Sequence, residues 1–224
     1  MTDTTATQAF YGRWARLYDV LASAPWIRSW RARAVAALDL TPGDTVVEMG
    51  VGTGANLPAL REAVGSNGRV VGVDLTRGML AVARRRVDTG GWDNVNLVRG
   101  DATRPPVRGP VDAVLGSFIV GMVRNPADAI RIWADLVGSD GRLALLDAAR
   151  SERPLAAPVN LGLRAFVRLT APGKRRGNTP PIEVLEARLA EARDALAATT
   201  TSHDECRFAG GVVRLRWGRL GRGE

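Results

Sequence analysis

Short apolar runs alternate with amphipathic stretches through the middle of the chain. The runs predict strands, and the stretches, whose apolar residues recur every three or four positions, predict helices. Strands are expected near residues 45–49, 69–73, 95–99, 111–116 and 142–147. Helices are expected near 55–64, 77–88 and 126–137. Strands and helices that alternate at this spacing are typical of a parallel sheet covered on both faces, so we predict an α/β core.

Further elements are predicted on either side of this core. Helices are expected at 6–22, from Pro25 to about Leu38, and at 181–197, and strands near 200–208 and 211–217. Two glycines between the last strands favour an antiparallel hairpin at the sheet edge. Residues 148–180 break the pattern. The predicted parts are an N-terminal helical cap (1–40), a core (41–147), a basic apolar insertion or lid (148–180), and a C-terminal helix and strands that complete the sheet (181–224).

Composition excludes several classes of protein. Of the 224 residues, 46% are hydrophobic and 24% are charged, close to globular averages, so wholesale disorder is not expected. No apolar run reaches the roughly 18 residues of a membrane-spanning helix. The first residues lack the apolar stretch of a secretory signal. A single cysteine, Cys206, excludes an internal disulfide and a cysteine-rich zinc site. We predict a cytoplasmic protein without a metal centre.

Three glycines follow the first predicted strand. Gly50, Gly52 and Gly54 allow a tight turn and let a ligand approach the backbone, at the edge where open parallel sheets bind ligands. Their spacing also satisfies the dinucleotide-binding pattern. Glu48 argues for another ligand, because a carboxylate would repel a pyrophosphate and attract an ammonium and a sulfonium. Asp74, which closes the second strand, can accept both hydroxyl protons of a ribose.

Five segments, in order, resemble the motifs of class I S-adenosylmethionine-dependent methyltransferases. They read EMGVGTG at 48–54, VGVDLTRGML at 71–80, GDA at 100–102, NPADAI at 125–130 and GSDGRLALLD at 138–147. The resemblance implies a Rossmann-like, doubly wound sheet of seven mostly parallel strands, with an antiparallel C-terminal strand and the N-terminal helices as a cap. It implies S-adenosyl-L-methionine as the cofactor and methyl transfer as the activity.

The same resemblance indicates which residues hold the cofactor. Asp74 is expected to bind the ribose, Leu75 to pack on the adenine, and Asp101 to face the adenine amine. Met79 is either an adenine contact or a core residue. The expected cofactor contacts are Glu48, Gly50, Gly52, Thr53, Gly54, Asp74, Leu75, Met79, Asp101, Ala102, Ser117 and Tyr18.

The acceptor side has fewer candidate residues. Tyr11, in the first helix, and Phe118, after the fourth strand, are expected to line the substrate pocket. Asp147, which closes the fifth strand, is the candidate base or orienting acceptor, and a purely structural carboxylate is the alternative. A base is needed only if the acceptor carries a proton that must leave, so no catalytic residue is assigned.

Two short stretches resemble narrower groups of methyltransferases. FYGRWARLYD at 10–19 is similar to the start of the quinone-biosynthesis and the bacterial phosphatidylethanolamine methyltransferases. GGVVRLRWGR at 210–219 is similar to the closing strand of the quinone group. These resemblances imply a small hydrophobic acceptor, either an isoprenoid quinol or a phospholipid headgroup. A soluble metabolite is the alternative acceptor.

Residues 150–176 hold much of the positive charge of a chain whose net charge is +8. They combine seven basic residues and one acid with apolar residues, a pattern typical of a segment that rests on an anionic membrane surface. A solvated loop is the alternative.

RNA is disfavoured as a substrate, because GSFI at 116–119 replaces the Asn/Asp-Pro-Pro-Tyr/Phe signature of base amino-methylation. A non-catalytic binding protein is disfavoured by the intact glycines and acids. The oligomeric state is not predicted.

Overall fold

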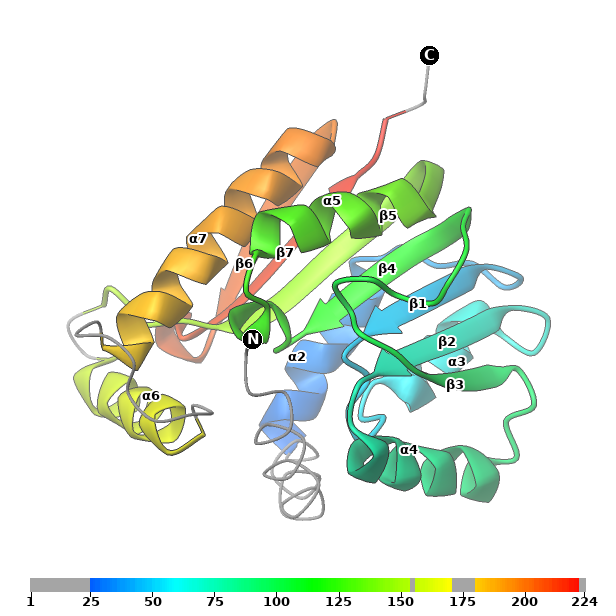
Figure 1. Cartoon of the computed structure of the whole chain (residues 1–224), viewed down its shortest axis with the longest axis horizontal. Helices are drawn as coiled ribbons and strands as arrows, with labels where there is room; N and C mark the ends of the chain where they lie inside the picture. The colour runs from blue at the N-terminus through cyan, green and yellow to red at the C-terminus, as the bar shows by residue number, and fades with distance from the viewer. Residues whose placement is uncertain (1–24, 154–155, 171–179, 222–224) are drawn as a thin grey trace.

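The computed structural model describes residues 25–153, 156–170 and 180–221. Within them, seven strands form one sheet: β1 (Thr45–Met49), β2 (Arg69–Asp74), β3 (Val95–Arg99), β4 (Val111–Ser117), β5 (Val137–Ala148), β6 (Ser202–Phe208) and β7 (Val213–Arg219). Their order across the sheet is β3-β2-β1-β4-β5-β7-β6 (Figure 1). The helix expected at 6–22, with Tyr11 and Tyr18, lies outside the described residues.

β1 lies in the middle of the parallel part of the sheet. It pairs in parallel with β2 on one side and β4 on the other, so the strand order reverses between β1 and β4. β3 and β5 extend the parallel array. β7 runs antiparallel to β5, and β6 antiparallel to β7. The predicted doubly wound sheet with an antiparallel C-terminal strand is confirmed. β1 and β4 form its switch point, the place where sheets of this kind bind ligands.

Helices cover both faces of the sheet, as Figure 1 shows. They are α2 (Pro25–Ala36), α3 (Leu57–Val64), α4 (Arg77–Gly90), α5 (Pro126–Leu136), α6 (Ala157–Thr170) and α7 (Pro181–Thr199), with short 3-10 turns η1 (Val120–Met122) and η3 (Ala209–Gly211). α2, α3 and α4 share one core cluster with one face of the strands, and α5 and α7 share a second cluster with the other. Val46 belongs to the first cluster and Val47 to the second, because successive strand side chains point to opposite faces.

α3 and α5 show why these segments are helical. Each has a proline in its first turn, where the missing N–H leaves no bond unmade. Leu57, Leu60 and Val64 of α3 are buried and recur at helical spacing, so one face of the helix packs on the sheet. Trp133 of α5 is fully buried on the opposite face. Burial of each such large apolar side chain contributes about 1.5–3 kcal/mol.

The structure corrects one expected boundary and adds one helix. β5 begins at Val137, so the expected start at 142 is wrong. Val137 pairs with Val111, and the register then shifts until Arg142 stands opposite Ala113, so pairing with β4 extends the strand through an irregular stretch. The segment 148–180, expected as an insertion or lid, contains the regular helix α6, which contacts α7 and lies apart from the sheet in Figure 1. Among the described helices, none is both long and apolar enough to cross a bilayer.

Candidate functional site

The chain bends sharply after β1 at the three glycines. The φ angles of Gly50, Gly52 and Gly54 are +70°, +56° and +78°, in the left-handed region that other residues rarely adopt. The backbone N–H groups of Gly50 and Val51 both donate to the carbonyl oxygen of Val73, which holds the bend against the end of β2. A Cβ on Gly50 would lie 2.8 Å from Ile119 Cδ1, whereas a Cβ on Gly52 would meet only a backbone oxygen at 3.9 Å. Gly52 therefore leaves open backbone for a ligand.

Asp74 is bound to this glycine bend. Its Oδ2 accepts a hydrogen bond from the Gly52 N–H at 2.9 Å, and its Oδ1 accepts one from the Thr76 N–H at 2.8 Å. Burial raises the pKa of the Asp74 carboxyl, and the hydrogen bonds from Thr76 and Gly52 oppose that rise. The Thr76 side chain and the Leu75 N–H also donate to this carboxylate and lower its pKa. The structure thus brings Asp74 and the glycines together, as the sequence predicts.

Glu48 presents one free carboxylate oxygen beside the bend. The side chain is 1% exposed, and Oε1 accepts a hydrogen bond from Asn56 Nδ2 at 2.5 Å. Oε2 is buried and has no hydrogen-bond partner among the described residues. Burial raises the pKa of Glu48 to about 8, although the hydrogen bond from Asn56 and the charge of Arg31 both lower it. A buried carboxylate with a free oxygen is suited to a cationic ligand.

Two residues of this site are absent from the sequence predictions. Asn56, which is fully buried, also donates from Nδ2 to Ser117 Oγ at 3.0 Å and accepts at Oδ1 from Arg31 Nη1 at 3.0 Å. The Arg31 guanidinium lies 5.4 Å from the centre of the Phe118 ring. We call Arg31, Asn56, Glu48 and Ser117 the buried polar chain. One signal was available in the sequence, because Arg31 shares the helical spacing of the buried residues Ala34, Val35 and Leu38.

Unpaired buried polar atoms gather around the same bend. The described residues hold five such side-chain atoms, and three of them are Glu48 Oε2, Thr53 Oγ1 and Arg31 Nε. The remaining two are Nε atoms of Arg61 and Arg214. Each buried polar group without a partner costs stability, and a polar ligand bound at this place would supply partners for these atoms. S-adenosylmethionine, with an ammonium, a carboxylate and ribose hydroxyls, fits this set of donors and acceptors.

The residues expected around the adenine lie at the neighbouring ends of β2 and β3. Asp101 is exposed, and its Oδ1 accepts from both the N–H and the hydroxyl of Thr103 at 2.8 Å. The carbonyl of Ala102 accepts from Trp133 Nε1 at 2.7 Å. Leu75 is half-buried and Met79 is 4% exposed. The structure brings these residues to the correct edge of the sheet, and their contacts with a cofactor stay a prediction.

Asp147 lies away from the buried polar chain. Its neighbour Leu146 belongs to the core cluster of α2, α3 and α4, and Leu145 to the cluster of α5 and α7, so Asp147 faces the latter side. Burial raises the pKa of Asp147 to about 7, and the charge of Arg216 opposes this rise. Arg216 itself donates to Glu205 Oε2 at 2.6 Å. The structure therefore does not bring Asp147 together with Glu48 and Ser117.

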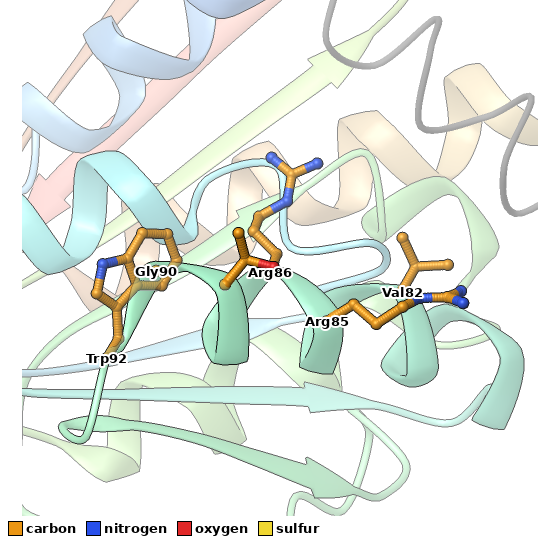
Figure 2. A pocket seen from close by; sticks show the side chains of 6 residues that line it. Val82, Arg85, Arg86, Gly90 and Trp92 are labelled. Atoms are coloured by element: carbon orange, nitrogen blue, oxygen red, sulfur yellow. The ribbon is translucent and has the colours of Figure 1, made fainter.

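Two surface hollows lie elsewhere on the molecule. One, of about 450 Å³, is lined by Val82, Arg85, Arg86, Thr89, Gly90 and Trp92 at α4 (Figure 2). The other, of about 470 Å³, runs between α7 and β6. Neither includes the glycine bend, so the candidate site is defined by the strand ends. No cluster of three or more His, Cys, Asp or Glu side chains suited to a metal occurs among the described residues.

Comparisons with known proteins agree with this geometry. Residues 46–151 match the family model described as a methyltransferase domain. The demethylmenaquinone methyltransferase of Shouchella clausii (strain KSM-K16) is 37% identical over 145 residues, which cover 62% of this chain and 60% of that protein. The aklanonic acid methyltransferase DauC of Streptomyces sp. (strain C5) is 35% identical over 114 residues, which cover 50% of this chain and 51% of that protein.

A solved structure shows the same fold. The SAM dependent methyltransferase from Aquifex aeolicus aligns with a TM-score of 0.58 at 20% identity, over 85% of this chain and 89% of that chain. The matched segments span between 36% and 64% of the length of the curated relatives. Residues 46–151 thus match a methyltransferase domain, on a fold shared with the Aquifex aeolicus structure.

Proposed function

We propose that the protein transfers a methyl group from S-adenosylmethionine to a small hydrophobic acceptor, an isoprenoid quinol or a phospholipid headgroup. The observation that carries this proposal is the free, buried Oε2 of Glu48 beside the glycine bend. An ammonium group there would supply the missing hydrogen bond and balance the charge. Asp74, bound to the same bend, is the proposed acceptor for the ribose hydroxyl groups.

In this reaction the protein has to hold the cofactor and align it with the acceptor, and it does not have to protonate the leaving group. S-adenosylmethionine supplies a methyl group on a sulfonium, whose thioether leaves without a proton. Gly52 would offer bare backbone to the cofactor, and Glu48 and Asp74 would fix its two polar ends. Ser117 and Phe118, at the end of β4, would set the acceptor against the cofactor and exclude water. Alignment of this kind accounts for most of the rate gain in such a displacement.

The proposed acceptor rests on the relatives and on one surface helix. The Shouchella clausii relative is named for a quinone, demethylmenaquinone, which supports a quinol acceptor. In α6, Val159 and Leu161 are 50% and 68% exposed, although both are large apolar side chains. Arg164 and Arg168 of the same helix are exposed, and residues 157–170 include no acid.

We propose that α6 contacts an anionic membrane surface, from which the acceptor would be taken. The half-buried residues Asn160, Leu163 and Val167 share one face of the helix. Leu161 lies on a neighbouring exposed side together with Arg164 and Arg168. Exposed apolar residues flanked by arginines are the pattern of a helix that lies in the plane of a membrane surface. α6 follows the carboxyl end of β5, which is the edge of the sheet that carries the glycine bend.

Labelled cofactor tests the acceptor. Incubation of the protein with methyl-labelled S-adenosylmethionine and total cell extract should place label in the lipid-soluble fraction, and purified demethylated quinol and phosphatidylethanolamine would then separate the two lipid classes. The Asp74→Ala variant is the control for non-enzymatic transfer. Label confined to polar metabolites or to RNA would overturn the proposed acceptor, and absence of label from every fraction would overturn methyl transfer itself.

A soluble metabolite is the second candidate acceptor. The observation that favours it is the Streptomyces relative, which is named for aklanonic acid and matches a similar share of this chain. The polar-metabolite fraction of the same experiment tests this candidate directly.

A further inference from the structure

The side-chain amide of Asn56 is held in one orientation by a donor at its oxygen and two acceptors at its nitrogen. Its oxygen accepts from the Arg31 guanidinium, and its nitrogen donates to Glu48 Oε1 and Ser117 Oγ. The reversed amide would set its NH₂ against the Arg31 guanidinium, which is also a donor and is positively charged, and would take the donor away from Glu48 Oε1. Asn56 is fully buried, so water cannot replace either partner.

Asn56 also separates Arg31 from the carboxylate. Arg31 donates its hydrogen bond to the amide of Asn56. The positive charge of Arg31 still lowers the pKa of Glu48, and the negative charge of Asp74 raises it. A guanidinium bound directly to Glu48 would take both carboxylate oxygens and neutralise the group. With the amide between them, Oε1 is fixed and Oε2 stays free.

We propose that Asn56 and Arg31 are positioning residues, which fix the Glu48 carboxylate so that Oε2 receives the ammonium group of the cofactor. This inference rests on the proposed pairing of Glu48 with the ammonium group. Ser117 is bound to the same amide, and Phe118 lies under the same guanidinium, so the buried polar chain also joins the cofactor side to the acceptor side.

Two ligands that differ only in the tail separate positioning from general folding. S-adenosylhomocysteine carries the ammonium and carboxylate, and 5′-methylthioadenosine has the same adenosine and a thioether without that tail. Calorimetric titration should show that Asn56→Ala and Arg31→Met each lower the affinity for S-adenosylhomocysteine by about tenfold or more. A loss of this size is typical of one charge-assisted hydrogen bond. Binding of 5′-methylthioadenosine should change by less than about threefold, a difference below 1 kcal/mol.

Matched variants control for charge and for folding. Arg33→Met removes an exposed arginine from the same helix and should leave both affinities unchanged. If Asn56→Ala fails to fold, Asn56→Asp is the substitute, because it keeps the shape of the side chain but places a second carboxyl against Glu48. Its affinity for S-adenosylhomocysteine should fall, and its affinity for 5′-methylthioadenosine should not. Arg31→Lys, which keeps the charge, should recover part of the loss caused by Arg31→Met.

The outcomes distinguish this inference from the proposed function. Equal losses for both ligands in the Asn56 and Arg31 variants, or no loss for either, would overturn the positioning role. Glu48→Gln should abolish the preference for the tail-bearing ligand. If it does so while Asn56 and Arg31 variants keep that preference, only the positioning role fails. If Glu48→Gln keeps the preference, the pairing of Glu48 with the ammonium fails as well.

Discussion

Asn56 Nδ2 lies 2.5 Å from Glu48 Oε1, although Asn56 is fully buried and Glu48 is only 1% exposed. One carboxylate oxygen is therefore satisfied by the protein, and the other, Oε2, is left without a partner among the described residues. Burial of that oxygen without a hydrogen bond destabilises the unliganded protein, and a cationic ligand that binds it would restore the lost stability. Stability and binding should consequently respond in opposite directions to changes at Glu48.

Glu48→Gln should stabilise the unliganded protein. The pKa of Glu48 rises from 4.5 to about 8 on folding, so between these pH values the folded protein holds a proton that the unfolded chain releases. The free energy of unfolding therefore falls as pH rises through this window, by about 1.4 kcal/mol for each pH unit. Glutamine does not titrate, so the advantage of the variant should grow from about pH 5 to pH 8, by about 1.4 kcal/mol per unit at most.

Urea denaturation of both proteins across this pH range measures the difference. Exposed Glu62→Gln is the matched control, because it makes the same chemical change on the surface of α3 and should follow the parent protein. A constant difference between Glu48→Gln and the parent at all pH values would contradict the assignment of the proton to Glu48.

Binding of S-adenosylmethionine should release a proton from Glu48 near neutral pH. With a pKa of about 8, the carboxyl is mostly protonated at about pH 7 before binding, and pairing with an ammonium favours the ionised form. Calorimetry in two buffers with different ionisation enthalpies should give different apparent binding enthalpies for the parent protein. Glu48→Gln should remove that part of the difference. Identical proton release by the two proteins would show that Glu48 stays in one protonation state.

Gly50→Ala and Gly52→Ala should have different effects. A methyl group added at Gly50 would clash with Ile119 in addition to meeting an unfavourable φ, so the free energy of unfolding should fall by about 2–4 kcal/mol. At Gly52 the added Cβ has space, so stability should fall by only about 1–2 kcal/mol from the backbone. Cofactor affinity should nevertheless suffer more at Gly52, because the methyl group occupies open backbone proposed for the ligand.

Thermal unfolding and calorimetric titration compare the two glycine variants. Ile119→Val in the Gly50→Ala background should recover the part of the unfolding free energy that is lost to the steric clash. It should not recover the part that is lost to the unfavourable φ of residue 50. Equal stability losses at both glycines would mean that the contact with Ile119 adds nothing.

Arg164→Glu with Arg168→Glu should weaken binding to anionic vesicles roughly tenfold or more, because each arginine near such a surface contributes about 1 kcal/mol. Co-sedimentation with phosphatidylcholine vesicles, with and without phosphatidylglycerol, measures the effect. Arg84→Glu with Arg85→Glu makes the same charge change on the exposed surface of α4 and should bind like the parent protein. Equal losses in both double variants would reduce the effect to net charge, and no binding by the parent would remove the membrane proposal.

The parallel core and its site edge could be read from the chain with little error. Apolar runs placed β1 to β4 within one residue of their observed ends, and the carboxylates Glu48 and Asp74 fall beside the glycine bend. β5 was harder, because Val137 joins the strand only through pairing with Val111. The alternation of apolar and polar residues does not predict a contact between segments that are distant in the sequence.

Asp147 shows a second kind of limit. β5 is apolar on both faces, so the sequence around Asp147 does not reveal which face the carboxylate takes. Packing against α5 and α7 decides it, and separates Asp147 from Ser117 on the neighbouring strand.

The sequence by itself determined the order of strands and helices, the bend at Gly50 and Gly52, and the acids next to it, because periodicity and backbone freedom are local properties. Only the tertiary structure decided that Arg31 of α2 reaches Asn56, and through it Glu48 and Ser117. Those four side chains come from four separate segments. They meet because α2 and α3 pack on the same face of the sheet, and the burial of that face leaves each polar group only the others as partners.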